Sequence, residues 1–145
     1  MKKIFFTTFV LINLVLVSQA QQNKHTVGEK FGGGVVFFIT DDGLHGLIAE
    51  TIDQGKTNFK QAEGIAKTGI HSIAGKGFSD WRMPTKIELN NMYLQKNIIG
   101  GFTSNTYWSS TVNDNVTSWA QNFSNGFNTQ SDDLLSFCVR AVRAF

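Results

Sequence analysis

The sequence predicts a single α+β domain with two helices, an antiparallel sheet and a loop-rich C-terminal half. Three observations predict this fold class. Two apolar runs separated by a turn over residues 35–49 indicate a β-hairpin. Residues 57–67 and 85–96 have helical periodicity, and short alternating runs between polar turns fill the sequence after residue 100.

Residues 1–20 have the pattern of a secretory signal peptide. Lys2 and Lys3 form a basic start, an apolar run extends to Val17, and Ala20 supplies a small residue before the cleavage position. Because the apolar run is shorter than the about 20 residues that a membrane span needs, we expect cleavage after Ala20, with an uncleaved anchor as the alternative. The protein is therefore expected to be secreted, periplasmic or on the cell surface, without a membrane span after cleavage.

The polar residues 21–30 are expected to form a flexible lead-in, so that the folded domain occupies residues 31–145. Without Lys2 and Lys3 the formal net charge of +2 falls to zero, which leaves no overall basic footprint for nucleic acid. Cys138 is the only cysteine, so no disulfide forms within the chain and the Phe and Trp residues are expected to stabilise the core. Cys138 is expected to be an inert, partly buried thiol, with pairing between chains as the alternative.

The first strand is predicted at Val35–Ile39, which is apolar on both faces and therefore typical of a central strand. Asp41–Gly43 is a tight-turn signal, and Leu44–Ala49 is the returning strand. Gly32–Gly34 precedes the first strand, whereas a phosphate-binding loop follows a strand and opens a helix, so we expect only close backbone packing at these glycines.

The first helix is predicted at Thr57–Lys67, where the apolar residues recur on one side. The second is predicted from Thr85 to Lys96, with Gly100–Gly101 ending it. Thr85 and Glu88 form a capping-box pair, in which each side chain can satisfy the other residue's backbone amide. Pro84 lies just before the cap, where a proline costs no helical hydrogen bond.

Short strands are predicted in the C-terminal half. In Trp119–Phe123 the two bulky end residues fall on one face, with Ala120 and Asn122 on the other. Ser136–Phe145 alternates like one half-buried strand, and we expect it to pair with the N-terminal strands.

The best candidate for ligand binding is an aromatic and amide-rich stretch of the C-terminal half. Sugar recognition needs a flat apolar ring for the C–H face of the sugar and planar polar groups for its hydroxyls. The candidate ligand residues are Trp119, Gln121, Asn122, Asn125 and Asn128. The alternative for Trp119 is a place in the core, and Trp81 and Trp108 are expected to be core residues.

Metal and catalytic chemistry have little support. His25, His45 and His71 are isolated, with no ligand spacing between them, so neither a metal nor a cofactor is expected. No nucleophile-elbow motif is present. Cys138 has Arg140 as a same-face neighbour but no base nearby in sequence, so the chain is not expected to be an enzyme.

Four segments carry a resemblance to the DUF1566 family, also called the Legionella collagen-like protein C-terminal domain family. They are Phe31–Phe38 with His45–Ala49, Ser79–Leu89 (SDWRMPTKIEL), Tyr107–Thr111 (YWSST) and Cys138–Arg140. This family resembles the C-type lectin-like and formylglycine-generating-enzyme-like domains. The resemblance implies a C-type lectin-like fold and a secreted or surface module, in the best-known member an adhesin domain that trimerises and binds sulfated glycans.

The sequence departs from this family at several positions. Ala62 or Ala66 stands where many members have a cysteine in the first helix, which leaves Cys138 without a partner. The sequence has no collagen-like stalk, and Pro84 is its only proline, so the calcium-site motif of sugar-binding lectins is absent.

We therefore expect a non-enzymatic binding module, adhesin-like and carbohydrate-binding, whose partner is a glycan or a surface protein. The alternatives are a protein-binding or structural envelope module, alone or as a homo-oligomer, and a degenerate formylglycine-generating-enzyme-like enzyme. Structural roles are expected for Trp81, Arg82, Pro84, Thr85, Glu88 and Trp108.

Overall fold

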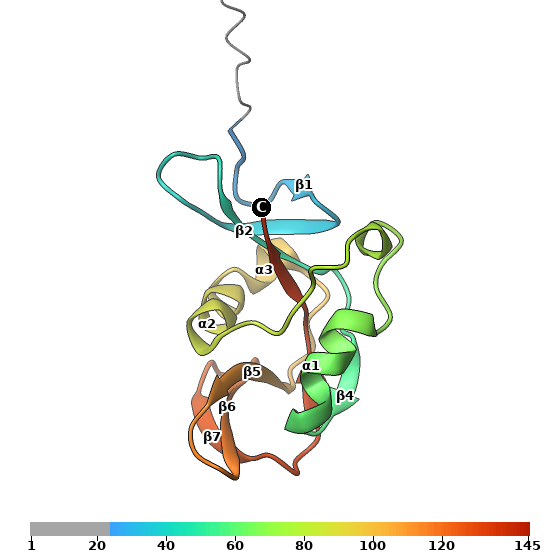
Figure 1. The fold of residues 1–145 in the computed structure, drawn as a ribbon. Coiled ribbons are helices and arrows are strands. Elements are labelled where there is room, and N and C mark those ends of the chain that lie inside the picture. The colour runs from blue at the N-terminus through green and yellow to red at the C-terminus, as the bar shows by residue number, and fades with distance from the viewer. Residues whose placement is uncertain (1–23) are drawn as a thin grey trace, which may run out of the picture.

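The computed structural model describes residues 24–145, which form two β-sheets and three α-helices (Figure 1). The first sheet has the order β1-β2-β3-β9 and the second the order β4-β8-β5-β6-β7. All strand pairs are antiparallel except β5 with β8. The strands are β1 (Lys30–Phe31), β2 (Gly34–Ile39), β3 (Gly46–Ala49), β4 (Gly55–Thr57), β5 (Thr106–Val112), β6 (Thr117–Asn122), β7 (Asn128–Asp132), β8 (Phe137–Val139) and β9 (Val142–Ala144). The helices are α1 (Phe59–Thr68), α2 (Lys86–Leu94) and α3 (Lys96–Ile99), with a short 3₁₀ turn η1 (Gly75–Gly77). The predicted α+β class is confirmed.

The predicted hairpin is formed by β2 and β3, with Val35 opposite Ala49 and Val36 opposite Ile48. The turn between them is held by Asp42, whose Oδ1 accepts hydrogen bonds from the Thr40 hydroxyl (2.6 Å) and the Leu44 amide (2.8 Å). This is the local side-chain bonding that makes Asp a turn residue.

The predicted signal peptide, residues 1–20, and residues 21–23 lie outside the described part of the chain. Residues 25–30, expected to belong to a flexible lead-in, are instead bonded to the first sheet. The amide of His25 donates to the Gly43 carbonyl (2.9 Å) and that of Gly28 to the Val36 carbonyl (2.8 Å). The His25 ring also packs edge-on against Phe145, with centroids 4.8 Å apart. Backbone bonding and ring packing therefore order a segment whose composition alone is polar.

Strands β5 and β6 of the second sheet pack against other elements on both faces. Trp108 and Ala120, opposite each other on β5 and β6, belong to the core cluster that includes Ala62 and Ala66 of α1. Tyr107, on the other face, belongs to the cluster that contains Leu89 and Met92 of α2. Helix α1 begins two residues later than predicted, because Asn58 acts as its N-cap and accepts from the Gln61 amide (3.1 Å).

Helix α2 has the predicted capping box: Thr85 Oγ1 accepts from the Glu88 amide (3.2 Å), and Glu88 Oε2 accepts from the Thr85 amide (2.8 Å). The predicted single helix to Lys96 is wrong, because Gln95 leaves helical geometry and α3 starts as a separate helix. Lys96 is thereby placed to donate from Nζ to the Phe123 carbonyl (2.9 Å). Gly100 then ends α3 with a φ of 75°, a conformation that glycine adopts readily. Within residues 24–145 no helix has the length and hydrophobicity that a membrane crossing requires.

Replacing Glu88 with glutamine is expected to lower the free energy of unfolding at neutral pH by about 1–2 kcal/mol. Burial alone raises the pKa of Glu88, but hydrogen bonds from Arg82 and the Thr85 amide outweigh it and hold the pKa below its usual value. A carboxyl with a lowered folded pKa stabilises the fold above its unfolded pKa, and this stabilisation is lost as the pH falls through the folded pKa. Urea titrations should therefore show a gap between wild type and Glu88→Gln that closes in acid. A constant gap would contradict this, and Asp41→Asn on the exposed turn is the control.

The C-terminal segment corrects another prediction. Residues 136–145 form two strands in two sheets: β8 pairs with β4 and β5, and β9 pairs with β3. The predicted pairing with the N-terminal hairpin is therefore present. The predicted solvent-exposed face is absent, because Cys138, Arg140 and Val142 are all buried. Arg140 lies at the crossing point between the sheets. Its guanidinium bonds to Asp53 Oδ1 (2.8 Å) and to the carbonyls of Glu50 (3.0 Å), Gly100 (3.1 Å) and Gly101 (2.6 Å).

Candidate functional site

The candidate ligand residues of the C-terminal half do not form one exposed site. Trp119 is half-buried on β6, and the Lys86 ammonium lies 3.0 Å from the centroid of its ring. This cation–π contact covers a ring face that a sugar would need. Phe123 does not share a surface face with Trp119, because it lies beyond the end of β6 and packs in the core against Tyr107, with centroids 4.5 Å apart.

Gln121 is fully buried, so it is not available to a ligand. Its amide nitrogen donates to Asn90 Oδ1 (2.9 Å) and to the Gly126 carbonyl (3.0 Å), which joins β6 to α2 and to the following turn. Ala120, on the opposite face of this strand, is likewise buried, because α1 covers that side of the sheet.

The three asparagines differ from one another in their surroundings. Asn122 Oδ1 accepts from the Ser124 amide (2.8 Å), and Asn125 Oδ1 accepts from the Phe127 amide (3.0 Å). These are the local turn bonds in which asparagine side chains replace backbone partners. Asn128 is exposed on β7, an edge strand of the second sheet.

Three of the residues expected to be structural, Trp81, Pro84 and Trp108, are buried. Trp81 and Trp108 are buried, and each indole N–H donates over 2.9 Å to a backbone carbonyl, Gly75 and Thr57 respectively. Pro84 is buried, and its carbonyl accepts from the Ser110 amide (2.7 Å). The Ser79–Leu89 segment and the Tyr107–Thr111 segment therefore meet directly.

Arg82 links the loop before α2 to the helix itself. Its two terminal nitrogens each donate over 2.7 Å to Glu88, a bidentate pair, and Nη1 also donates to the Met83 carbonyl (3.0 Å). The hydrogen bonds to Glu88 raise the pKa of Arg82. The Arg82 guanidinium is thus already paired with the Glu88 carboxylate.

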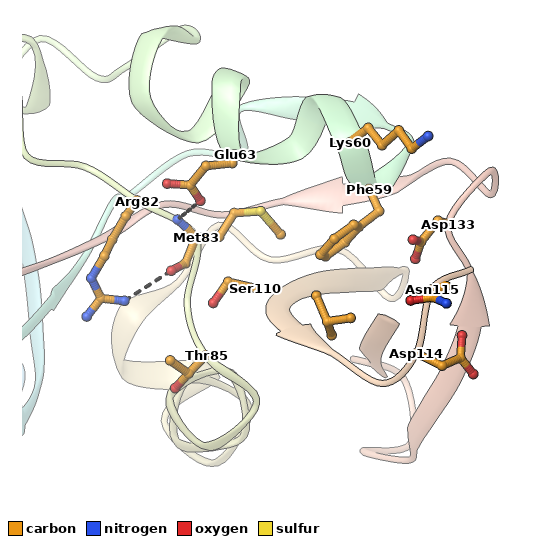
Figure 2. Close-up of a pocket in the computed structure, with 11 residues that line it drawn as sticks. Phe59, Lys60, Glu63, Arg82, Met83, Thr85, Ser110, Asp114, Asn115 and Asp133 are labelled. Carbon is orange, nitrogen blue, oxygen red and sulfur yellow. Dashed lines mark hydrogen bonds between the residues drawn. The ribbon is translucent and has the colours of Figure 1, made fainter. Parts of the chain in front are cut away.

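A hollow of about 820 Å³ lies between α1, the loop before α2 and the β5–β6 hairpin (Figure 2). We call it the α1–β5 pocket. It is lined by Phe59, Lys60, Glu63, Arg82, Met83, Thr85, Ser110, Val112, Asp114, Asn115 and Asp133. Its volume falls within the range typical of small-ligand sites.

The α1–β5 pocket has an apolar middle and polar ends. Figure 2 shows Phe59 and Met83 between Glu63 and Arg82 on one side and Asp133 with Asn115 on the other. Phe59 is held by edge-on packing on Trp108, with centroids 5.6 Å apart. The Met83 amide donates to Glu63 Oε2 (3.2 Å), which fixes the loop against α1.

Two carboxylates at the hairpin end differ in their bonding. Asp114 Oδ1 accepts from the amides of Val116 (2.9 Å) and Thr117 (2.8 Å). These hydrogen bonds lower the pKa of Asp114, and the bond from Val116 has the largest effect. Asp133 Oδ1 is sealed from solvent and has no hydrogen-bond donor among the described residues. Buried acceptors without donors are uncommon, so Asp133 is the member of the lining that most needs a partner.

Sequence reasoning missed the α1–β5 pocket because its lining comes from four distant segments. The signal that could have found it is the pair of family-like segments, since Arg82, Met83, Thr85 and Ser110 all belong to them. The contact between residues 84 and 110, and the position of α1 beside it, depend on the folded structure and have no signal in the sequence.

Residues 24–145 contain no group of three or more His, Cys, Asp or Glu side chains that could hold a metal ion. Cys138 is buried. Its burial raises the pKa of its thiol, and the negative charge of the nearby Asp53 raises this pKa further. The thiolate is the nucleophilic form of cysteine, so this environment suppresses nucleophilic chemistry at Cys138.

Comparison with known proteins gave one family match. The family model described as the Lcl C-terminal domain matches residues 39–143, well over half of the chain. No curated protein matches the chain.

Proposed function

The chain belongs to the Lcl C-terminal domain family, and from this premise we propose that it is a non-enzymatic, adhesin-like module that binds carbohydrate in the α1–β5 pocket. The family is one of surface or secreted modules. We also propose that the domain is a variant of the C-type lectin-like fold, which the pairing of β9 with the N-terminal hairpin supports.

The observation that carries the proposal is the composition of the α1–β5 pocket. The half-buried Phe59 and the exposed Val112 provide an apolar surface beside the buried Met83, and an amide and carboxylates lie at the ends. A sugar ring has the matching chemistry, with an apolar C–H face and hydroxyls on its edge. The Trp119 face lacks this arrangement, because Lys86 covers the indole and Gln121 is buried.

The non-enzymatic part of the proposal is supported by the state of Cys138. The environment of this thiol disfavours its ionisation, and its sulfur has only a weak 4.0 Å contact with the Thr103 hydroxyl rather than with a base. A degenerate enzyme of the formylglycine-generating type would need reactive cysteine chemistry that this single buried thiol does not supply.

A glycan array probed with the purified protein tests the proposal. We expect saturable binding to a related set of glycans, equal in calcium and in chelator. Asn115→Ala, which removes an exposed amide of the pocket, should weaken binding roughly tenfold, as the loss of one good polar contact does. Asn128→Ala removes an exposed amide outside the pocket and is the matched control. Loss of binding in Asn128→Ala or Trp119→Ala, with Asn115→Ala unchanged, would move the site to the Trp119 face.

A protein partner is the second candidate, favoured by apolar side chains beside the pocket mouth. Val112, Val116 and Leu134 are exposed by 56%, 65% and 80%. Val116 and Leu134 line a smaller hollow of about 200 Å³ that shares Lys60, Asn115 and Asp133 with the α1–β5 pocket. A blank array together with concentration-dependent assembly in light scattering would favour this candidate.

A further inference from the structure

The charged residues that line the α1–β5 pocket are the cations Lys60 and Arg82 and the carboxylates Glu63, Asp114 and Asp133. We infer that the pocket selects glycans that carry hydroxyl and ammonium donors and disfavours sulfated glycans. The inference rests on the proposed function and adds the chemical class of the ligand.

The main contributor is Asp133. One of its carboxylate oxygens is sealed from solvent without a donor, so this carboxylate is poorly solvated compared with one on an open surface. Its backbone is fixed at both groups: the amide donates to the Val116 carbonyl (3.0 Å), and the carbonyl accepts from the Phe59 amide (3.0 Å). A donor brought to the other oxygen therefore compensates a charge that the protein itself leaves under-solvated. An ammonium group compensates it best, and a hydroxyl compensates it in part.

The neighbouring acidic groups act in the same direction. Asp114 also lines the pocket, and Asp132 lies in the adjoining hollow. The bonds to backbone amides that lower the pKa of Asp114 keep it charged. Carboxylates thus gather at the hairpin end of the pocket, where Figure 2 places Asp114 and Asp133 with Asn115.

The cations of the pocket do not offset this acidity for a sulfate. The guanidinium of Arg82 is held by both oxygens of Glu88, and Glu63 at the same end pairs with Lys67 over 3.3 Å. Lys60 is the one pocket cation that forms no ion pair within the described residues, and it is exposed. A sulfated glycan would gain one solvated ammonium contact and face several carboxylates, which favours its exclusion.

The test compares three probes by calorimetry: a glucosamine tetramer, its N-acetylated counterpart and a sulfated heparin-derived tetrasaccharide. We expect affinity to fall in that order, with the preference for the glucosamine tetramer weakening as salt is raised. Asp133→Asn, which preserves the shape of the side chain, should lower affinity for the glucosamine tetramer roughly tenfold.

Lys60→Ala should act in the opposite direction and raise affinity for the glucosamine tetramer. This exposed position keeps the test decisive even if Asp133→Asn disturbs folding, which a thermal melt reveals. Asp41→Asn, which removes an exposed carboxylate of the β2–β3 turn, should leave all affinities unchanged.

Tightest binding of the sulfated probe would overturn the inference while leaving carbohydrate binding in place. Unchanged affinity in both Asp133→Asn and Lys60→Ala would also overturn it. Absence of binding to all three probes and to the glycan array would overturn the inference and the proposed function together.

Discussion

Replacing Arg140 with methionine is expected to lower the free energy of unfolding by about 3–5 kcal/mol, the cost of removing one partner of a buried ion pair. The side chain of Arg140 is fully buried and lies over the Phe102 ring at 4.0 Å. Its loss would leave Asp53 without its cation and three backbone carbonyls without donors. Asp53 also accepts from the Tyr107 hydroxyl (2.8 Å), and burial raises the pKa of Tyr107 to about 12.

Thermal and urea denaturation measure this effect. For a domain of this size we expect the melting temperature to fall by about 10–20 °C. Arg143→Met is the matched control, since Arg143 pairs with the largely exposed Asp80 and donates to one carbonyl, that of Gly32. Its loss should cost about 1–2 kcal/mol. Equal losses in the two variants would show that the Arg140 network contributes no more than a surface pair.

Replacing Gly75 with alanine is expected to lower the free energy of unfolding by about 2–4 kcal/mol. A Cβ at this position would press on the Glu50 carboxylate, which is fully buried. Glu50 is fixed by the amide of Thr51 (2.7 Å) and by contacts with Ser72 (3.3 Å) and the His71 ring (3.2 Å). The carboxylate therefore has no free direction in which to move, and the loop must detach from it.

Gly77→Ala is the control, two residues along in the same 3₁₀ turn, where an added Cβ meets nothing within 4 Å. Its stability should be unchanged or raised by less than about 1 kcal/mol, because alanine has less chain entropy to lose on folding. Hydrogen exchange at residues 70–77, measured beside urea titrations, should rise in Gly75→Ala alone. Similar behaviour of the two variants would contradict a loop anchored on Glu50.

The elements that could be predicted from the sequence have local causes. The β2–β3 hairpin follows from an Asp-rich turn between apolar runs, and the start of α2 follows from Thr85 and Glu88, which bond to each other's amides. The break at Arg140 could not be predicted in this way. Neither glycine nor proline marks it, and the alternation of residues 136–145 continues through it. The chain crosses there between two sheets, which is a property of the whole fold.

The candidate site shows the same division. Trp119 and Gln121 alternate correctly for one face of a strand, but helix α2 covers that face, and its residues Lys86 and Asn90 engage both side chains. Asn122 and Asn125 have the composition of a sugar site, yet their oxygens bond to turn amides. Covering elements are distant in sequence, so composition alone could not distinguish an exposed amide from a buried one.

The packing of His25 and Phe31 against Phe145 has a consequence for how the protein can be displayed. It brings both ends of the described chain to one pole, and Figure 1 shows α1 and β5–β7 at the other. A tether attached at either end of the described chain would therefore lie on the side of the domain away from α1 and β5, two of the elements that line the α1–β5 pocket. Immobilisation on a sensor through either end should give the same ligand capacity, and fusion to a stalk or scaffold need not obstruct the ligand's approach.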